Sequence, residues 1–368
     1  LILTVCYIIL IFTYTVGWVR TAEIISPFIP GKTRLSVIIA ARNEAQTIEK
    51  CLKSIIANDY PMDLYEIIVA DDNSTDETAE IVRHIAEINK NIKLISLAEI
   101  DIQKNGKKAA LSKAIEQAEG ELIIMTDADC EVENTWLSCY SAYYEAYNPA
   151  MIAAPVSLVE DEKIFSRLQA LEFLSLIGVT CGSMRLNKPL MCNGANLAFT
   201  KKAYHSVKGY KGDCHVSGDD VFLMMKINDK FPGKVHFLKS KAALVKTATV
   251  KNFKQFIQQR KRWVSKTKKY RNTNIIAVGL LVYLFNLSLV VCLLMSIFSI
   301  FYLLLFLLLF IAKSITDFPL LSQTSRLTGQ SKLLWVFVLL QFIYIFYASI
   351  VPPLALTGAF RWKERTYK

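Results

Sequence analysis

The feature that most constrains the fold of this chain is a set of three long stretches without any charged side chain. They are residues 1–19, 272–312 and 333–360. A helix needs about 20 mostly apolar residues to cross the hydrocarbon core of a bilayer. The first stretch therefore predicts one span, the second predicts two, and the third predicts one that must kink or end at Pro352 and Pro353. Residues 301–310 have no polar face, which argues against helices buried in a soluble core.

The first apolar stretch is expected to remain as an N-terminal membrane helix, residues 1–20. It lacks the basic leading region of a secretory signal peptide. It also lacks a small-residue cleavage site, since Trp18, Val19 and Arg20 follow the apolar run. We therefore expect an uncleaved anchor.

Composition agrees with a chain that separates apolar from charged residues. Hydrophobic residues make up 53% of the chain and its mean hydropathy is +0.31, which is too apolar for an ordinary soluble enzyme or a disordered chain. Charged residues still make up 20%, so the whole chain cannot lie in a membrane. The polar part is concentrated in residues 33–249, a length that fits one catalytic domain.

Residues 250–271 form a basic segment beside the second apolar stretch, and they contribute nine Lys and Arg residues and no acid to a net charge of +11. The positive-inside rule predicts that this segment and the domain before it face the cytoplasm, in an integral inner-membrane protein. The charges can anchor the chain to lipid headgroups. Their position beside a membrane block argues against nucleic acid as a partner.

The eight cysteines form no C-x-x-C pair, and the chain has four histidines. A zinc site is therefore not expected. Scattered reduced thiols suit a cytoplasmic domain.

The first half of the polar domain alternates between apolar strands and helices. Strands are predicted at residues 35–40, 66–70, 92–97 and 121–125. Helices are predicted from Ile48, after a capping box at Ser74 to Glu77, and over residues 107–118. This alternation indicates an α/β fold with a parallel sheet covered by helices on both faces.

Acidic residues follow three of these strands, at the sheet edge where ligands of such folds bind. Glu44 follows the first strand, Asp71 and Asp72 the second, and Asp127 and Asp129 the fourth. Carboxylates that converge in this way repel one another unless a cation sits among them, and their oxygens suit Mg²⁺ or Mn²⁺. A D-x-D sequence in extended backbone points both side chains the same way. Asp76 is read as a turn or cap acid.

Two other classes of nucleotide chemistry find no support. The chain has neither a Walker P-loop nor a G-x-G-x-x-G fingerprint, and Gly106-Lys107 lacks the upstream glycine. In the second half, Asp219 and Asp220 open a predicted helix, where one can cap it and the other can act as a general base. Arg262 can clamp a diphosphate, and Trp263 can stack on a sugar or sit at the membrane interface.

Taken together, these motifs resemble those of the membrane-integrated family 2 glycosyltransferases, which are inverting enzymes with a GT-A fold. The resemblance covers the polar domain and the flanking helices. Each motif is weak alone, and their combination in this order is specific. The matching segments are residues 36–44, 71–76, 127–129, 193–198, 218–220 and 259–263.

The resemblance implies roles for individual residues. Glu44 and Asp72 would hold the nucleoside, and Lys107 would assist at the diphosphate. Asp127 would lie near the ribose or the metal, and Asp129 would coordinate the divalent ion. Asp220 would be the base that deprotonates the acceptor hydroxyl, although Asp219 precedes it where Glu is commoner. The family's Q-x-x-R-W motif, on an interfacial helix that closes over donor and acceptor, is matched by Gln259, Arg262 and Trp263.

The resemblance also implies a hexosyltransferase that takes a nucleotide-diphosphate sugar, expected to be UDP-linked, and a lipid or glycan acceptor at a membrane. Three readings stay open. A single addition to a lipid is favoured because about four spans are few for a secretion channel, and because residues 361–367 resemble the tail of lipid-glycosylating relatives. A processive polysaccharide synthase is the alternative. An inactive membrane scaffold is disfavoured by the intact Asp72, Asp129 and Asp220.

About three spans are expected in residues 272–360, and this number leaves one conflict. An odd number of spans after a cytoplasmic domain would place the basic C-terminal tail on the non-cytoplasmic side, whereas the positive-inside rule favours the cytoplasm.

Overall fold

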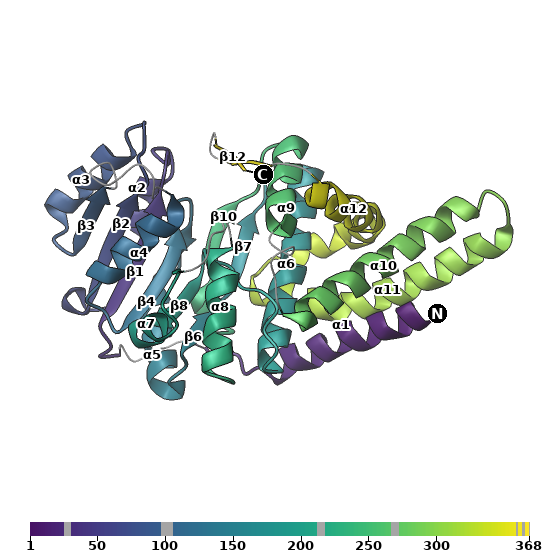
Figure 1. The fold of residues 1–368 in the computed structure, drawn as a ribbon, viewed down its shortest axis with the longest axis horizontal. Helices are drawn as coiled ribbons and strands as arrows, with labels where there is room; N and C mark the ends of the chain where they lie inside the picture. The colour runs from purple at the N-terminus through teal and green to yellow at the C-terminus, as the bar shows by residue number, and fades with distance from the viewer. Residues whose placement is uncertain are drawn as a thin grey trace. The chain divides into compact units, whose positions relative to one another are not determined.

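The computed structural model describes residues 1–25, 31–96, 106–211, 218–265, 272–357, 360–362 and 365–367. The chain forms two compact units that interleave along the sequence (Figure 1). Unit 1 comprises Leu1–Thr21, Val159–Leu190 and Thr249–Lys368. Unit 2 comprises Ala22–Leu158 and Met191–Ala248.

Unit 2 is built on a seven-stranded sheet with the order β3-β2-β1-β4-β8-β6-β9. The first four strands are parallel, and β8 then runs antiparallel to β4 and to β6. Strands β1 and β2 are buried almost throughout, which explains their continuous apolar sequences. The bounds are β1 (Leu35–Ala41), β2 (Tyr65–Asp71), β3 (Ile92–Ser96), β4 (Leu122–Asp127), β6 (Met151–Ala153), β8 (Leu197–Thr200) and β9 (Val235–Phe237).

Helices pack around this sheet, and a small second sheet has the order β5-β10-β7. The four predicted strands and the helices predicted from Ile48 and over residues 107–118 are confirmed. The helices are α2 (Ile48–Ile56), α3 (Thr78–Ile88), α4 (Lys107–Gln117), α5 (Trp136–Tyr147), α7 (Lys201–Ser206) and α8 (Asp219–Lys230). The short strands are β5 (Glu131–Val132), β7 (Val156–Val159) and β10 (Val245–Ala248). The fold is therefore the predicted α/β class, with the parallel strands expected in the first half of the domain and a mixed sheet overall, as in the GT-A fold that the sequence resembles.

The predicted capping box at Ser74 is wrong. The α3 helix has Glu77 at its N-cap position, without a side-chain cap bond. The Ser74 hydroxyl instead accepts a hydrogen bond from the Asn43 amide at 3.0 Å. Asp76 takes the capping role, since its carboxylate accepts from the Thr78 amide at 3.1 Å.

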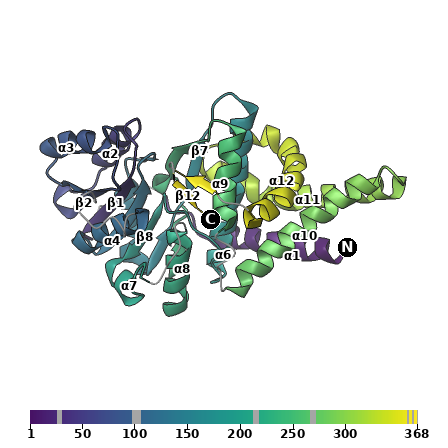
Figure 2. The same cartoon turned by 45° about the horizontal axis from the view of Figure 1, so that its top comes forward.

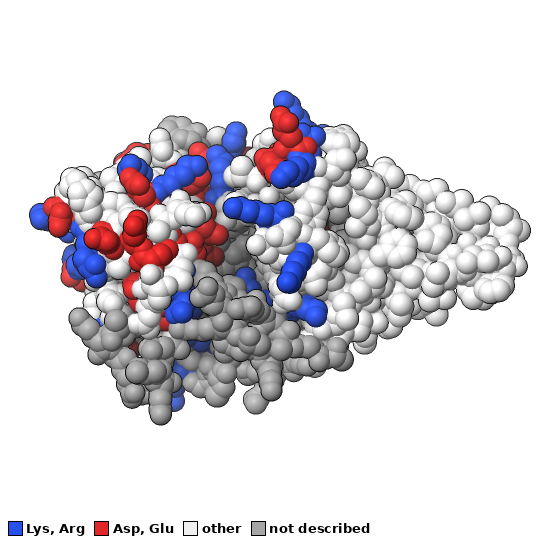
Figure 3. Space-filling view, turned by 90° about the horizontal axis from the view of Figure 1, so that it is seen from above, with Lys and Arg blue, Asp and Glu red and all other residues white. Residues whose placement is uncertain are grey.

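Unit 1 is helical, and five segments of the described chain are long and apolar enough to cross a membrane, which marks the chain as a membrane protein. Four overlap the charge-free stretches, although Ile300–Leu327 continues past residue 312 into charged residues, and the fifth is α6, inside the segment expected to be polar. In Figure 3 the visible surface of the long helices carries few charges, whereas charged residues of both signs cover much of unit 2. The elements are α1 (Ile2–Arg20), α6 (Ile164–Arg185), α9 (Phe253–Ser265), α10 (Thr273–Met295), α11 (Ile300–Leu327), η5 (Ser331–Val336), α12 (Phe337–Thr357), β11 (Phe360–Trp362) and β12 (Arg365–Tyr367).

The central helix of unit 1 is α6, which packs against both α1 and α11. Close approach to α1 depends on two glycines, because a Cβ on Gly17 would overlap the backbone of Gly182, and a Cβ on Gly182 would overlap the backbone of Tyr14. Small residues allow apolar helices to pack backbone to backbone. Glycines therefore fix where α1 crosses α6.

The chain on either side of α6 returns to the same sheet. Strand β6 precedes the helix, β8 follows it, and the two strands are hydrogen-bonded neighbours. A single membrane crossing by α6 would put these paired strands on opposite faces of the bilayer. We conclude that α6 starts and ends on the same side, despite its length and apolarity.

A buried polar cluster lies among the apolar helices of unit 1. The Lys313 ammonium is 2.7 Å from the Asp317 carboxylate one turn along α11, and the side chain of Lys313 is 1% exposed. Asp317 also accepts hydrogen bonds from the Tyr7 hydroxyl at 2.8 Å and from the Gln341 amide at 3.1 Å. Charges at such depth persist only when they are paired. This cluster therefore ties α1, α11 and α12 together.

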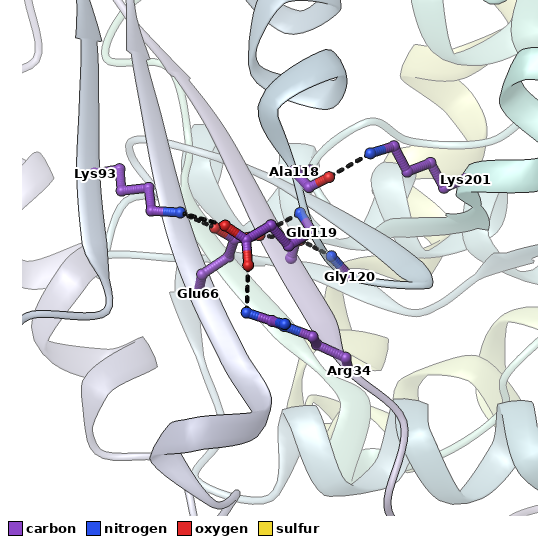
Figure 4. Close-up of polar contacts among 8 residues, drawn as sticks. Arg34, Glu66, Lys93, Ala118, Glu119, Gly120 and Lys201 are labelled. Atoms are coloured by element: carbon purple, nitrogen blue, oxygen red, sulfur yellow. Dashed lines mark hydrogen bonds and ion pairs between the residues drawn. The ribbon is translucent and has the colours of Figure 1, made fainter.

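A second polar cluster lies at the amino ends of the parallel strands, and we call it the amino-edge cluster (Figure 4). Buried Glu66 accepts hydrogen bonds from the Ser36 hydroxyl at 2.7 Å, the Glu119 amide at 2.6 Å and the Lys93 ammonium at 2.8 Å. The Gly120 amide donates to Ser36 at 2.8 Å, and a Cβ on Gly120 would overlap the backbone there. Glu66 is thus an acid with a structural role at the edge opposite to the strand ends that carry Asp72 and Asp127.

Replacing Gly182 with Ala is expected to lower the stability of the protein by about 1–3 kcal/mol, because the added methyl group meets backbone that cannot rotate away. Thermal unfolding in detergent measures the effect. Gly279→Ala is the matched control, since nothing lies within 4 Å of a Cβ there, and it should be neutral or stabilising. Equal melting temperatures for the Gly182 variant and the wild type would contradict this packing.

Replacing Glu66 with Gln is expected to cost about 2 kcal/mol of unfolding free energy near neutral pH. Burial alone would raise the pKa of Glu66. Hydrogen bonds from Lys93, the Glu119 backbone and Ser36 lower it by more, so the pKa in the folded protein is below the usual value. A carboxylate with a depressed folded pKa contributes stability above its unfolded pKa of about 4.3, and this contribution is lost as the pH falls through the folded pKa.

Denaturant unfolding as a function of pH checks this expectation. The difference between wild type and Glu66→Gln should shrink below about pH 4. Glu80→Gln, at an exposed position on α3, is the control and should change little at any pH. A difference for Glu66→Gln that stays constant down to acidic pH would refute the assignment.

Candidate active site

The register of three parallel strands brings the predicted acids to one edge of unit 2. Ala41 at the end of β1 pairs with Asp71 at the end of β2, and Ala40 pairs with Asp127 at the end of β4. The three strands therefore finish level with one another. Whatever follows them lies at their common carboxyl edge.

Two asparagines turn the chain at this edge. Asn43 has φ 52° after β1 and Asn73 has φ 56° after β2, a left-handed conformation that Asn tolerates better than most residues. The Asn43 side-chain oxygen accepts from the Thr75 amide at 2.8 Å. The two turns are thus bonded to each other and form one rigid rim.

The nucleoside candidates Glu44 and Asp72 sit on this rim. Asp72 is 3% exposed, and Arg42 donates to its backbone oxygen at 2.8 Å while lying 3.9 Å from its carboxylate. The Glu44 carboxylate accepts from the Thr47 hydroxyl at 3.0 Å. Arg42 was not among the sequence candidates, although it lies within the motif that contains Glu44.

The structure brings Lys107 and Asp127 into direct contact. The Lys107 ammonium is 2.7 Å from the Asp127 carboxylate, and the two side chains are 26% and 35% exposed. Lys107 is the first residue of α4, after Gly106 with φ 144°. The pair is therefore partly accessible, with a cation held next to the D-x-D acid.

Asp129 is exposed, and two buried thiols lie beneath the D-x-D sequence. The Cys51 thiol contacts the Asp127 backbone oxygen, and the Cys130 thiol contacts the Asp129 carboxylate, both at 3.6 Å. Burial raises the pKa of both thiols, and the charges of Asp129 and Asp127 raise it further. The thiols stay protonated, so the donors offered here are carboxylate oxygens. All seven cysteines in the described part of the chain are free.

The candidate base Asp220 lies at the start of α8. Its carboxylate accepts hydrogen bonds from the Gly194 amide at 3.2 Å and from the Val221 amide at 2.9 Å. Gly194 precedes β8, whose first residue, Leu197, pairs with Met125 near the end of β4. Because β8 is antiparallel, its amino end lies at the carboxyl edge of β4. Asp220 is thereby bonded to the same edge as Asp127.

Asn196 supports this edge, and the sequence analysis gave it no role. It is fully buried, and its side-chain oxygen accepts from Trp136 at 3.0 Å and Tyr140 at 2.8 Å. Its amide nitrogen donates to the Pro155 and Ala243 carbonyls, both at 2.7 Å. All four hydrogen-bonding positions are used, so Asn196 ties α5, β8 and two loops together. The available signal was its place in the segment 193–198, which matches the family motif.

Gln259, Arg262 and Trp263 lie on α9 of unit 1, so they belong to a different compact unit from the other candidates. Trp263 packs near Phe173 of α6, with ring centroids 6.1 Å apart. The buried residue of this motif is Arg260, which no sequence signal distinguished from its basic neighbours.

A divalent ion would meet two carboxylates at the end of β4. Among the residues that the structure describes, no group of three or more His, Cys, Asp or Glu could hold a metal. Mg²⁺ and Mn²⁺ commonly bind through one or two carboxylates, with phosphate oxygens and water completing the shell. Exposed Asp129, with Asp127 beside it, fits an ion of that kind.

Comparison with known families agrees with this geometry. The model of glycosyl transferase family 2 matches residues 36–207. The model of glycosyl transferase family group 2 matches residues 122–360, which is more than half of the chain. The chain therefore belongs to the family 2 glycosyltransferases.

Curated relatives match parts of the chain. Glycosyltransferase AglE of Haloferax volcanii is 36% identical over 103 residues, covering 28% of this chain and 33% of the relative. The β-monoglucosyldiacylglycerol synthase of a Nostoc species is 33% identical over 103 residues, covering 28% and 22%. The poly-β-1,6-N-acetyl-D-glucosamine synthase of Staphylococcus epidermidis is 28% identical over 198 residues, covering 53% and 45%. The chain thus spans less than half the length of these relatives.

One solved structure resembles nearly the whole chain. It is the mannosyltransferase PcManGT from Pyrobaculum calidifontis in complex with GDP-Man and Mn²⁺, with a TM-score of 0.59 and 20% identity. It covers 95% of this chain and 96% of its own. At this identity the likeness concerns the fold, which is that of the GT-A transferases.

Proposed function

We propose that the protein is an inverting glycosyltransferase that moves a sugar from a nucleotide-diphosphate donor to the hydroxyl of a lipid or membrane-linked acceptor. The observation that carries the proposal is the gathering of Asp72, the Lys107–Asp127 pair, Asp129 and Asp220 at one sheet edge. A membrane acceptor is supported by the five apolar helices. The basic, acid-free segment of residues 250–271 supports a cytoplasmic orientation.

The donor would lie along the carboxyl edge. Glu44 and Asp72, on the rigid rim after β1 and β2, suit the hydroxyl and amide donors of a nucleoside. Lys107 can exchange its bond to Asp127 for the diphosphate, because both side chains are partly exposed. A Mg²⁺ or Mn²⁺ ion held by Asp129, with Asp127 beside it, would neutralise charge on the leaving diphosphate.

Asp220 would take the proton of the acceptor hydroxyl. The acceptor oxygen then attacks the anomeric carbon as the bond from that carbon to the diphosphate oxygen breaks, with inversion of configuration. Amides of Gly194 and Val221 fix the orientation of the Asp220 carboxylate, so the base is preorganised. Gln259, Arg262 and Trp263 would contribute substrate contacts, as the resemblance to the family motif implies.

A processive polysaccharide synthase is the second candidate. It is favoured by the relative named poly-β-1,6-N-acetyl-D-glucosamine synthase, which matches 53% of this chain. The single-addition reading is favoured by the relative named β-monoglucosyldiacylglycerol synthase. A UDP-linked donor is part of the proposal, and the structural neighbour that binds GDP-Man makes GDP-sugars the first alternative.

Membranes that contain the protein, supplied with radiolabelled UDP-, GDP- and dTDP-sugars, test the proposal. Transfer of one sugar to lipid is the expected result, and a product that grows in length would establish the synthase. If no donor sugar is turned over, both the transferase and the synthase are refuted, and the inactive membrane scaffold is the reading that remains.

Asp220→Asn is expected to lower kcat by about 10²- to 10⁴-fold, because the amide cannot accept the hydroxyl proton. Donor binding should stay near the wild type, and thermal stability should fall only modestly, because the Asn nitrogen cannot accept one of the two backbone amide hydrogen bonds. Asp229→Asn, at an exposed position on the same helix, is the control and should retain full activity. Normal turnover by the Asp220 variant would refute the assignment.

Asp129→Ala is expected to abolish the metal-dependent part of donor binding. Isothermal calorimetry with and without Mn²⁺ measures it, and Asp63→Ala, at an exposed site, is the control. The wild type and the control should bind donor more tightly with Mn²⁺, and the Asp129 variant should not. Identical metal dependence in all three proteins would exclude a metal role for Asp129.

A further inference from the structure

The Gln-x-x-Arg-Trp segment contains a cation that is closed off from solvent. Arg260 is 1% exposed, although its neighbours Lys261 and Arg262 are only half-buried. Its guanidinium donates to the carboxylate of Glu172 on α6, where the two side chains are 2% and 7% exposed. The charge of Arg260 is therefore committed to an internal partner, and it is not available to a diphosphate.

Arg260 also contacts two of the three motif residues. It donates to the side-chain oxygen of Gln259 at 2.8 Å, and its guanidinium lies over the ring of Trp263 at 4.1 Å. The guanidinium also lies over the ring of Phe256, at 4.6 Å. A planar guanidinium with a fork of donors can make all these contacts at once, which an ammonium cannot.

The anchor of this arrangement is itself firmly held. Glu172 lies on α6, the helix whose crossing with α1 depends on Gly17 and Gly182. Glu172 is followed by Phe173, whose ring faces Trp263. Removing one partner of a buried ion pair leaves an uncompensated buried charge, which is strongly destabilising. The pair therefore links α9 to α6 at this point.

We propose that Arg260, anchored by Glu172, is a positioning residue that holds Gln259 and Trp263 in the orientation needed for sugar transfer. This inference rests on the function proposed above. It divides the work of two arginines on one helix: Arg260 orients the motif from inside unit 1, and Arg262 stays partly exposed for a substrate.

The kinetic test uses Arg260→Lys in the full-length protein. The lysine keeps the charge but loses the fork and the flat face, so kcat is expected to fall about 10- to 100-fold. The donor KM should change less than kcat, because Glu44, Asp72, Lys107 and Asp129 of unit 2 are proposed to hold the donor independently of the motif. Lys254→Met removes an exposed cation from the same helix and should leave both constants unchanged. A kcat per folded molecule equal to that of the wild type would overturn the proposal.

A double-mutant cycle asks whether Arg260 acts through the motif. Gln259→Ala and Arg260→Lys should each lower kcat, and the double variant should be no slower than the worse single variant. Losses that multiply would mean that Arg260 acts independently of Gln259, which would also overturn the proposal.

Trp263 fluorescence provides a measurement that needs no activity. Glu172→Gln should shift the tryptophan emission, because the guanidinium loses its anchor above the ring. The shift should vanish when the same change is made in a Trp263→Phe background. An equal shift in both backgrounds would refute the contact. A wild type without transfer from any donor would refute the proposed function, while this measurement would still decide whether Arg260 positions Trp263.

Discussion

Strand β1 is hydrogen-bonded in parallel along both of its edges, to β2 on one side and to β4 on the other, and the candidate site depends on this pairing. Parallel register makes the three strands end together, so acids that are far apart in sequence become neighbours. A slip of one residue would turn every side chain of a strand to the opposite face. Both faces of β1 and β2 are closely packed, so such a slip would exchange side chains of different size and polarity between the two faces. The antiparallel strand β8 then brings the loop bonded to Asp220 to the same edge.

The parts of this arrangement that sequence could predict are those with a local signal. Buried parallel strands read as apolar runs, helices show a periodic face, and acids directly after a strand must lie at its end. Strands β6, β8 and β9 are three or four residues long, too short for any periodic pattern. Local sequence alone gives no reason to reject the capping box at Ser74, because the Ser74 hydroxyl accepts a hydrogen bond from the Asn43 amide, 31 residues away.

The residues that sequence missed have partners far along the chain. Arg260 and Glu172 are 88 residues apart, and each looks like an ordinary surface charge in its own segment. Helix α6 escaped prediction because Arg167, Glu172 and Arg185 interrupt an otherwise apolar run. The same long-range pairing explains Asn196, whose four partners come from α5 and two loops. Motif matching marks such positions, but only the fold shows what they touch.

The basic tail that conflicted with three C-terminal spans can be understood from one contact in unit 1. Strand β11, after the last long helix, lies against α9, which precedes the first one, and Figures 1 and 2 both show the C-terminal hairpin beside α9. A chain that leaves one face of a slab and returns to that face crosses it an even number of times. If α9 lies along one membrane face, as the sequence resemblance implies, the number of complete crossings among α10, α11 and α12 is even. An even number would place the basic tail on the side of α9, in agreement with the positive-inside rule.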